Sequence, residues 1–171
     1  MEYKVEERRP FTVCGMEVEI TGWQNKNIEI CRSLWIKFNK ILNREHLHQC
    51  GNWRKYAITY KKNGKMFYFC AIPEQYKLPS EFEVKSISRQ FYLIYEHVGD
   101  MATIKDTINI IYKDFFPNHK LVPDDTEFFH FERYDKRFYW DSPISVIDIY
   151  VPVTKQSVYE EIGEVEYGND I

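Results

Sequence analysis

The chain has 171 residues, of which 44% are hydrophobic, and this predicts one globular domain or two fused half-domains with a buried core. Its net charge of -3 comes from interspersed acidic and basic residues, which supply no basic stripe for phosphates, so direct nucleic-acid binding is not expected. The N-terminus lacks the apolar run of a signal peptide, and no segment approaches membrane-spanning length. We therefore expect a cytoplasmic protein with no membrane partner.

Aromatic residues are the outlier of the composition. They form 17% of the chain, and the 13 tyrosines supply rings that can border a cavity while keeping a polar hydroxyl. This favours recognition of flat or hydrophobic ligands. The four cysteines contain no CxxC pair and are expected to be buried thiols: Cys14, Cys31, Cys50 and Cys70.

A short string of histidine and cysteine is the one pattern that could indicate a metal. His46, His48 and Cys50 alternate with other residues, and Glu45 could add an oxygen ligand. Structural zinc sites usually combine two separated clusters, however. A polar loop or helix end is the favoured interpretation, and neither a metal nor another cofactor is expected.

The first half of the chain predicts a strand, a helix and a hairpin. In order, they are a strand at 3–21, a helix from Ile28 to Leu42 with Asn25 or Asn27 as N-cap, and strands at 53–60 and 66–72. Gly15 is where the first strand could break. Asn63-Gly64 is the residue pair most suited to a tight hairpin turn.

The second half repeats this order. It predicts a long strand at 82–97, a helix at 104–115, and a hairpin of strands at 128–134 and 144–153. Pro117 blocks further extension of the helix. Both hairpins end in proline, at Pro73 and Pro152, and the repeated order indicates an internal duplication.

Two such units predict an α+β fold made of duplicated β-α-β-β units. We expect one antiparallel sheet with two helices on one face and a ligand groove between the halves on the other face. The domain should span 1–153, with pseudo-repeats at about 1–80 and 81–153. The acidic segment 154–171 is expected to be a solvated extension or a fraying terminus.

Glu132 is the candidate functional residue because alternation places it among aromatic side chains. It shares a strand face with Phe128 and Tyr134, and also with His130, which is expected to be a satisfied strand histidine. In the next strand the odd-numbered residues predict the core face, which leaves Tyr150 on the other. The hairpin should therefore present Glu132 and Tyr150 together.

Purely structural roles are the alternative interpretation for both acidic residues of this hairpin. A strand glutamate commonly faces solvent or pairs with a basic neighbour. Asp148, beside Tyr150 on the same predicted face, could simply pair with Arg133 or with a lysine. If Glu132 is buried among rings, its carboxyl pKa should rise, and a bound cation would lower that pKa again.

Four segments of the second half resemble the GyrI-like family, also called the AraC-type effector-binding or multidrug-binding domain. They are Phe91 to Gly99, Asp114 to Asn118, Phe131 to Tyr134, and Ile147 to Val153. The first resembles the family's strand before its second helix, and the third resembles a short motif with a central glutamate. The resemblance covers most of the chain.

The resemblance implies a pocket for small hydrophobic, often cationic molecules with the glutamate as acidic anchor. Glu132 and Tyr150 receive these roles. Further predicted ligand-binding residues are Tyr134, Phe128, Trp23, Phe69, Tyr95 and Trp140. Many relatives attach this domain to a DNA-binding domain, whereas Met1 lies close to the first strand here, so a stand-alone module is expected.

Three functions follow. The first is sensing or sequestration of hydrophobic, cationic compounds. The second, implied by family members that block DNA gyrase, is a protein-binding inhibitor with gyrase as partner. The third is a metal-independent hydrolase of cyclopropane-type DNA-alkylating electrophiles, in which Glu132 activates water and Tyr150 holds the substrate.

Overall fold

One mixed sheet forms the frame of the computed structural model, which describes residues 2–48, 51–163 and 166–168. Its strands and helices are, in chain order, β1 (Tyr3–Arg8), β2 (Phe11–Ile20), α1 (Gln24–Arg44), β3 (Lys55–Lys62), β4 (Lys65–Pro73), β5 (Glu83–Ile87), β6 (Gln90–Val98), η1 (Met101–Thr103), α2 (Ile104–Ile110), η2 (Ile111–Phe115), η3 (Phe116–Asn118), β7 (His130–Tyr134), β8 (Val146–Val153), α3 (Lys155–Ile162) and β9 (Glu166–Gly168).

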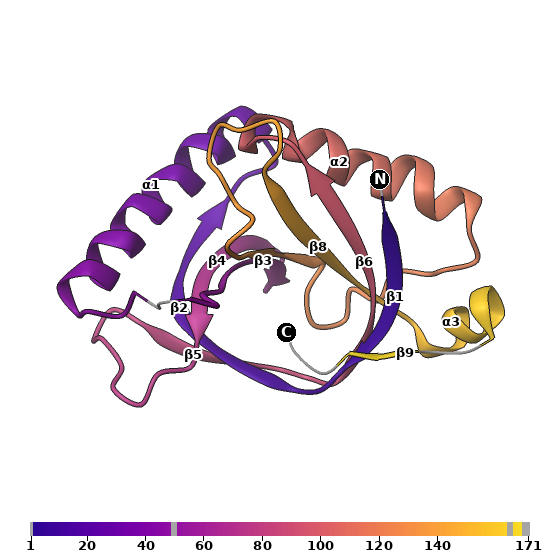
Figure 1. Cartoon of the computed structure of the whole chain (residues 1–171), viewed down its shortest axis with the longest axis horizontal. Coiled ribbons are helices and arrows are strands. Elements are labelled where there is room, and N and C mark those ends of the chain that lie inside the picture. The colour runs from indigo at the N-terminus through magenta and orange to yellow at the C-terminus, as the bar shows by residue number, and fades with distance from the viewer. Residues whose placement is uncertain (1, 49–50, 164–165, 169–171) are drawn as a thin grey trace.

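The strand order confirms the predicted fold class. Within the described residues the sheet has the order β5-β2-β4-β3-β7-β8-β6-β1-β9, and each strand pair is antiparallel except the parallel pair of β1 and β9. The triplet β2-β4-β3 of the first half is mirrored by β7-β8-β6 of the second half, so the halves meet where β3 pairs with β7. Helices α1 and α2 both cover one face of the curved sheet (Figure 1).

The two longest predicted strands are each divided in the structure. The first breaks at Arg9-Pro10 rather than at Gly15, because proline fixes its backbone and has no N–H for a ladder bond. The predicted strand at 82–97 breaks at Ser88-Arg89. As a result β1 pairs with β6 in the second half, while β5 pairs with β2 in the first half.

Gly15 has a different role from the predicted break. It lies inside β2, opposite Ala71 of β4. A Cβ atom at this position would lie 1.8 Å from the carbonyl oxygen of Cys70. Glycine therefore allows the two backbones to approach closely where the sheet curves.

The helices and the first hairpin turn largely follow the predictions. Asn63 and Gly64 both have positive φ, 52° and 77°, as a tight hairpin turn requires. Helix α1 begins earlier than predicted, at Gln24, and Asn27 does not cap it but bonds back to the backbone of Thr21 through its amide oxygen and nitrogen, each at 2.7 Å. None of the helices in the described part of the chain is long and apolar enough to cross a membrane.

The sheet buries a separate core on each face. Between the sheet and the two long helices lies a cluster that includes Phe38, Leu42, Ile111 and Ile149. On the other face, inside the curve of the sheet, the packed side chains are mainly aromatic and include Tyr56, Phe69, Tyr92, Phe128, Phe131 and Tyr150. We call the first the helix face and the second the inner face.

The segment after β8 is part of the fold, so the expectation of a solvated extension is wrong for residues 155–162 and 166–168. Thr154 caps α3 by accepting a bond from the backbone N–H of Ser157, and Val158 is fully buried. Ser157 Oγ accepts a bond from the backbone N–H of Val122 at 3.0 Å. Strand β9 then adds to the edge of β1.

The cysteines agree with the prediction where the structure describes them. Cys14 and Cys70 are buried free thiols, and Cys31 is a half-buried free thiol on α1. Burial raises the pKa of the Cys31 thiol to about 12, with a smaller contribution from nearby Glu132. Cys50 lies outside the described residues, so of the His46-His48-Cys50 string the structure describes only the two histidines.

Candidate functional site

Strand pairing at the junction of the two halves places Glu132 at the centre of the helix face. Its direct neighbours across the strands are Ala57 of β3 on one side and Ile149 of β8 on the other. Ala57 is fully buried and has the smallest side chain that keeps a Cβ atom, so room remains beside it for the longer glutamate. The carboxyl group is thus held between the sheet and the helices.

The surroundings of Glu132 are mainly apolar, and they favour the protonated form of its carboxyl group. The residue is 6% exposed, and burial raises the pKa of its carboxyl to about 7, while a hydrogen bond from Tyr134 lowers it in part. The Tyr134 hydroxyl donates that bond to Glu132 Oε2. Burial also raises the pKa of Tyr68 and Cys70 well above their ordinary values, so both are neutral near pH 7 and leave Glu132 without a charged partner among them.

Helix α1 covers Glu132 through Trp35. The Trp35 Nε1–H donates to the Tyr68 hydroxyl at 2.8 Å, and its ring meets the Tyr134 ring edge-on at 5.5 Å between centroids. Because Tyr68 lies on β4 and Tyr134 on β7, one tryptophan ties the helix to both halves of the sheet.

An aromatic cavity opens beside this cover. Its volume is about 110 Å³, and its lining residues are Trp35, Asn39, Trp53, Lys55, Tyr134, Phe138 and Trp140. We call it the aromatic pocket. Tyr134 belongs both to the pocket wall and to the hydrogen bond with Glu132, so it connects the pocket with the buried carboxyl.

The connection between β7 and β8 supplies one wall of the pocket, and several bonds hold it in place. The Phe138 ring packs edge-on against Tyr134 at 5.0 Å. The Tyr139 backbone N–H donates to Ser145 Oγ at 2.8 Å, and the Arg137 backbone carbonyl accepts from Val146 at 3.1 Å. Trp140, 55% exposed, therefore stands at the rim on an ordered loop.

The prediction that the hairpin presents Glu132 and Tyr150 together on one face is wrong. Tyr150 pairs with Phe131, not with Glu132, and therefore points to the inner face. There it stacks on the Phe131 ring with 4.5 Å between centroids. Burial raises the pKa of Tyr150 to about 12, although Arg133 and Arg8 favour the charged form.

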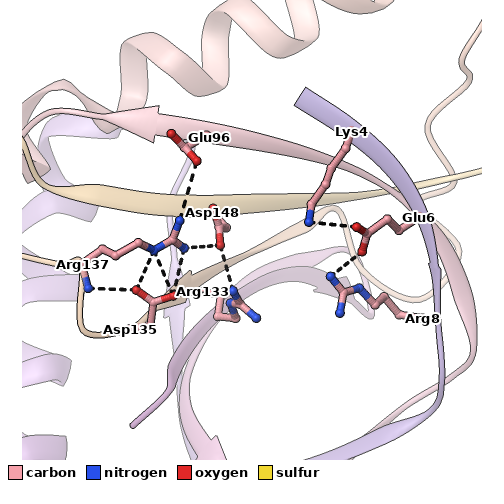
Figure 2. A network of polar contacts seen from close by, with 8 residues as sticks. All are labelled: Lys4, Glu6, Arg8, Glu96, Arg133, Asp135, Arg137 and Asp148. Carbon is pink, nitrogen blue, oxygen red and sulfur yellow. Dashed lines mark hydrogen bonds and ion pairs between the residues drawn. The ribbon is translucent and has the colours of Figure 1, made fainter. Parts of the chain in front are cut away.

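A network of charged side chains lies on the inner face (Figure 2), and Arg133 of this network lies 5.7 Å from the centre of the Tyr150 ring. Asp148 Oδ2 accepts from Arg133 at 3.0 Å and from Arg137 at 2.5 Å, which confirms the pairing with Arg133 that the sequence left open. Arg137 also binds Asp135 at 2.9 Å. These bonds engage Asp148 in the structure of the sheet and not in the aromatic pocket.

His130 also behaves as predicted, as a strand histidine with a partner. Its Nδ1 lies 3.2 Å from the hydroxyl of Tyr112, which lies on the π-helical turn after α2. Burial lowers the pKa of His130 to about 4, so the ring is neutral near pH 7.

Of the eight predicted ligand-binding residues, the structure brings three together: Glu132, Tyr134 and Trp140. Tyr150, Phe128 and Phe69 lie in the core of the inner face. Trp23 is 73% exposed before α1. Tyr95 is on the helix face but packs against Phe115, away from the pocket lining.

Sequence reasoning missed most of the pocket wall. The residues not predicted are Trp35, Asn39, Trp53, Lys55 and Phe138. The four-residue spacing of Trp35 and Asn39 on α1 could have paired two of them, and the two-residue spacing of Trp53 and Lys55 in the predicted strand 53–60 could have paired two more. Joining these pairs to each other and to Phe138 depends on strand register and loop course.

Comparison with known proteins adds a family to this geometry. The model of a family described as integron-associated effector binding protein matches residues 4–153. A search of curated proteins finds no significant match.

Solved structures share the fold at low sequence identity. SAV2435 bound to tetraphenylphosphonium matches 93% of this chain and 98% of its own, with a TM-score of 0.73 and 16% identity. The integron cassette protein VCH_CASS2 from Vibrio cholerae matches 89% of this chain and 95% of its own, with a TM-score of 0.60 and 18% identity. EcmrR in a complex with DNA matches 90% of this chain and 57% of its own, with a TM-score of 0.59 and 12% identity.

Proposed function

Since the chain belongs to the family of integron-associated effector binding proteins, we propose that it binds a hydrophobic, aromatic and cationic small molecule in the aromatic pocket. The observation that carries the proposal is the position of Tyr134, which lines the pocket and donates to the buried carboxyl of Glu132. Ring faces attract organic cations, and each such contact contributes roughly 0.5 to 2 kcal/mol. The structure of SAV2435 with tetraphenylphosphonium lends support from a protein of the same fold.

The charge of the ligand would be balanced by release of a proton. With a pKa of about 7, the Glu132 carboxyl is partly protonated at neutral pH. A cation placed near it favours the carboxylate and lowers this pKa. The positive charge of the ligand then replaces the proton, so the pocket gains little net charge when it is filled.

Calorimetry with tetraphenylphosphonium at pH 7 tests the role of Glu132, because this probe has no titratable proton and any proton released must come from the protein. The same titration in two buffers of different ionisation enthalpy gives the number of protons released. We expect about half a proton from the wild type, since a carboxyl with pKa near the working pH is half protonated. Glu132→Gln should release none and bind roughly 10- to 100-fold more weakly.

Glu83→Gln is the matched control, because Glu83 is an exposed residue on edge strand β5. It should bind and release protons as the wild type does. If Glu132→Gln keeps the wild-type affinity, the glutamate is not the anchor. If no aromatic cation produces a binding heat with the wild type, the function itself is wrong.

Hydrolysis of a strained electrophile is a second candidate, favoured by the pKa of Glu132. A carboxyl with a pKa of about 7 can accept a proton from water at neutral pH. The second group in such a site would be Tyr134, because Tyr150 lies on the inner face. Incubation with a cyclopropane-containing electrophile should then give the product with added water by mass spectrometry, and Glu132→Gln should bind without turnover. No acceleration over buffer by the wild type would exclude hydrolysis.

Binding alone leaves the biological role as sensing or sequestration. EcmrR, which shares the fold, forms a complex with DNA as a longer protein. Nothing among the described residues favours gyrase as a partner, and that alternative stays a prediction.

A further inference from the structure

The charged residue in the described lining of the aromatic pocket is Lys55, whereas Glu132 does not line the pocket and is bonded to Tyr134 in its wall. Lys55 begins β3 and is paired in register with Tyr134, so both side chains leave the same face of the sheet as neighbours. The Lys55 Nζ donates to Asn39 Oδ1 at 2.8 Å and lies 5.7 Å from the centre of the Trp53 ring. The ammonium is therefore held in place at the pocket wall.

Lys55 has no carboxylate partner among the residues that the structure describes. The ion pairs between these residues do not include it, although Glu132 lies only two pairs of residues further along the same two strands. Tyr134 is paired directly with Lys55 across the two strands, and its hydroxyl donates a hydrogen bond to the Glu132 carboxyl. Burial lowers the pKa of Lys55, as expected for an ammonium that has lost water without gaining an opposite charge.

A second cavity continues the basic character of this region. It has a volume of about 170 Å³ and shares Trp53 and Lys55 with the aromatic pocket. His48 and Arg54 also line it, and neither cavity has an acidic residue in its described lining. In the described lining of the aromatic pocket, Lys55 is therefore the charged side chain, and the Glu132 carboxyl is linked to this pocket through the hydroxyl of Tyr134.

We infer that the ligand has two poles: an aromatic cation that also carries an anionic acceptor such as a carboxylate, with Lys55 as the residue that recognises the acceptor. This inference rests on the proposed function and narrows its ligand class. An ammonium has three donors, of which Asn39 takes one, so two remain for a ligand oxygen. The cationic end then lies toward Tyr134 and Glu132, and the acceptor lies toward Lys55 and Asn39.

This arrangement explains how a cation can enter a pocket with a lysine in its wall. A ligand with only a positive charge would be repelled by Lys55 and would gain nothing from its free donors. A ligand with both charges at opposite ends meets an opposite charge at each pole. Selection between the two classes therefore depends on Lys55, whereas attraction of the cation depends on Glu132.

Rhodamine B and its ethyl ester form a probe pair that differs in a single group. Rhodamine B carries a carboxylate as well as the cationic ring system, and the ester keeps the cation alone. Fluorescence anisotropy titrations at pH 8 should show that the wild type binds rhodamine B about tenfold more tightly than the ester, the usual effect of one charge-assisted hydrogen bond. Lys55→Met should remove this preference by weakening rhodamine B binding about tenfold without weakening the ester.

Two further variants separate recognition from pocket shape. Lys65→Met removes a lysine that is 63% exposed and pairs with Glu19 at the first hairpin, and it should keep the preference. Lys55→Arg retains a donor and should restore part of it. If Lys55→Met does not fold, Asn39→Ala tests the same site, because the ammonium loses its positioning partner and the preference should shrink.

The outcomes distinguish this inference from the function on which it rests. Equal affinity of the wild type for both dyes, or a preference that Lys55→Met keeps, overturns the role of Lys55 while dye binding stands. Equal weakening of both dyes by Lys55→Met also overturns it, since the lysine would then only shape the pocket. Failure of the wild type to bind either dye removes the proposed function together with the inference.

Discussion

Glu132 is costly for the fold, and this cost makes it informative. Its carboxyl is enclosed by the sheet and α1 and has one hydrogen-bond donor, Tyr134, among the bonds between described residues. A buried carboxylate without an opposite charge is unfavourable, so the group keeps its proton until the pH reaches about 7. A leucine or methionine would pack at this position without that penalty.

The pH dependence of stability should reveal this cost. At pH 4 and below, Glu132 is protonated in the folded and the unfolded chain and has no effect. Between pH 4.5 and 7 the unfolded chain ionises while the folded chain keeps its proton, so stability is lost as the pH rises. Above pH 7 both states ionise and the loss stays constant at about 3 kcal/mol.

Urea denaturation of the wild type and Glu132→Gln isolates this contribution, because all other groups titrate equally in both. We expect the stability of Glu132→Gln relative to the wild type to rise by about 3 kcal/mol between pH 4.5 and 8. The nearest titratable groups on α1, β4 and β7 are Cys31, Tyr68, Cys70 and Tyr134, whose pKa values are all raised. A difference that does not change with pH would mean that Glu132 is ionised in the folded protein.

At the scale of elements, the sequence was sufficient where the signal is local. Helix α1, the Asn63-Gly64 turn and the order of the elements follow from spacing and turn chemistry, and all are present. The break at Pro10 also has a local cause and could have been predicted from it. Local signals thus predict which elements exist and in which order.

The relation between β7 and β8 could not be predicted in this way, because it depends on register. Every residue of β8 after Val146 is buried, so its alternation does not reveal which face carries the site. The connection of residues 135–145 is too long to fix the register as a two-residue turn would. A shift of one residue in the pairing of β7 with β8 decides whether Tyr150 shares a face with Glu132 or with Phe131. In the structure Tyr150 pairs with Phe131, so it lies on the face opposite to Glu132.

The pocket wall illustrates the same limit. Lys55 and Tyr134 become neighbours through the pairing of β3 with β7, strands more than 60 residues apart in the chain. Trp140 reaches the pocket on an irregular loop, where spacing carries no information. Glu132 was predicted from strand alternation and from a short motif, and its surroundings required the three-dimensional structure.

At the scale of the whole molecule, each half contributes an edge strand to the sheet of the other half. Strand β1 belongs to the predicted first half but pairs with β6 of the second half, and β5 belongs to the predicted second half but pairs with β2 of the first. Figure 1 shows the chain passing from β1 to β2 and from β5 to β6 along the bottom of the view, on the side away from α1 and α2. Together with the pairing of β3 and β7, this gives three sets of strand contacts that cross the predicted repeat boundary.

We therefore expect the halves to fold only together. The connection between β4 and β5 is a suitable place to cut the chain, since the Tyr76 side chain there is fully exposed. In a fragment 1–77, β1 has no partner and β3 loses β7; in a fragment 78–171, β5 has no partner and β6 loses β1.

Each fragment alone should lack near-ultraviolet circular dichroism and a cooperative thermal transition, because unpaired strands leave buried faces and backbone groups exposed to water. An equimolar mixture should regain both signals, in proportion to fragment concentration, as the crossing strand pairs reform. A cooperative transition in either fragment alone would show instead that the β-α-β-β unit is an independent domain and that the exchanged strands only attach one half to the other.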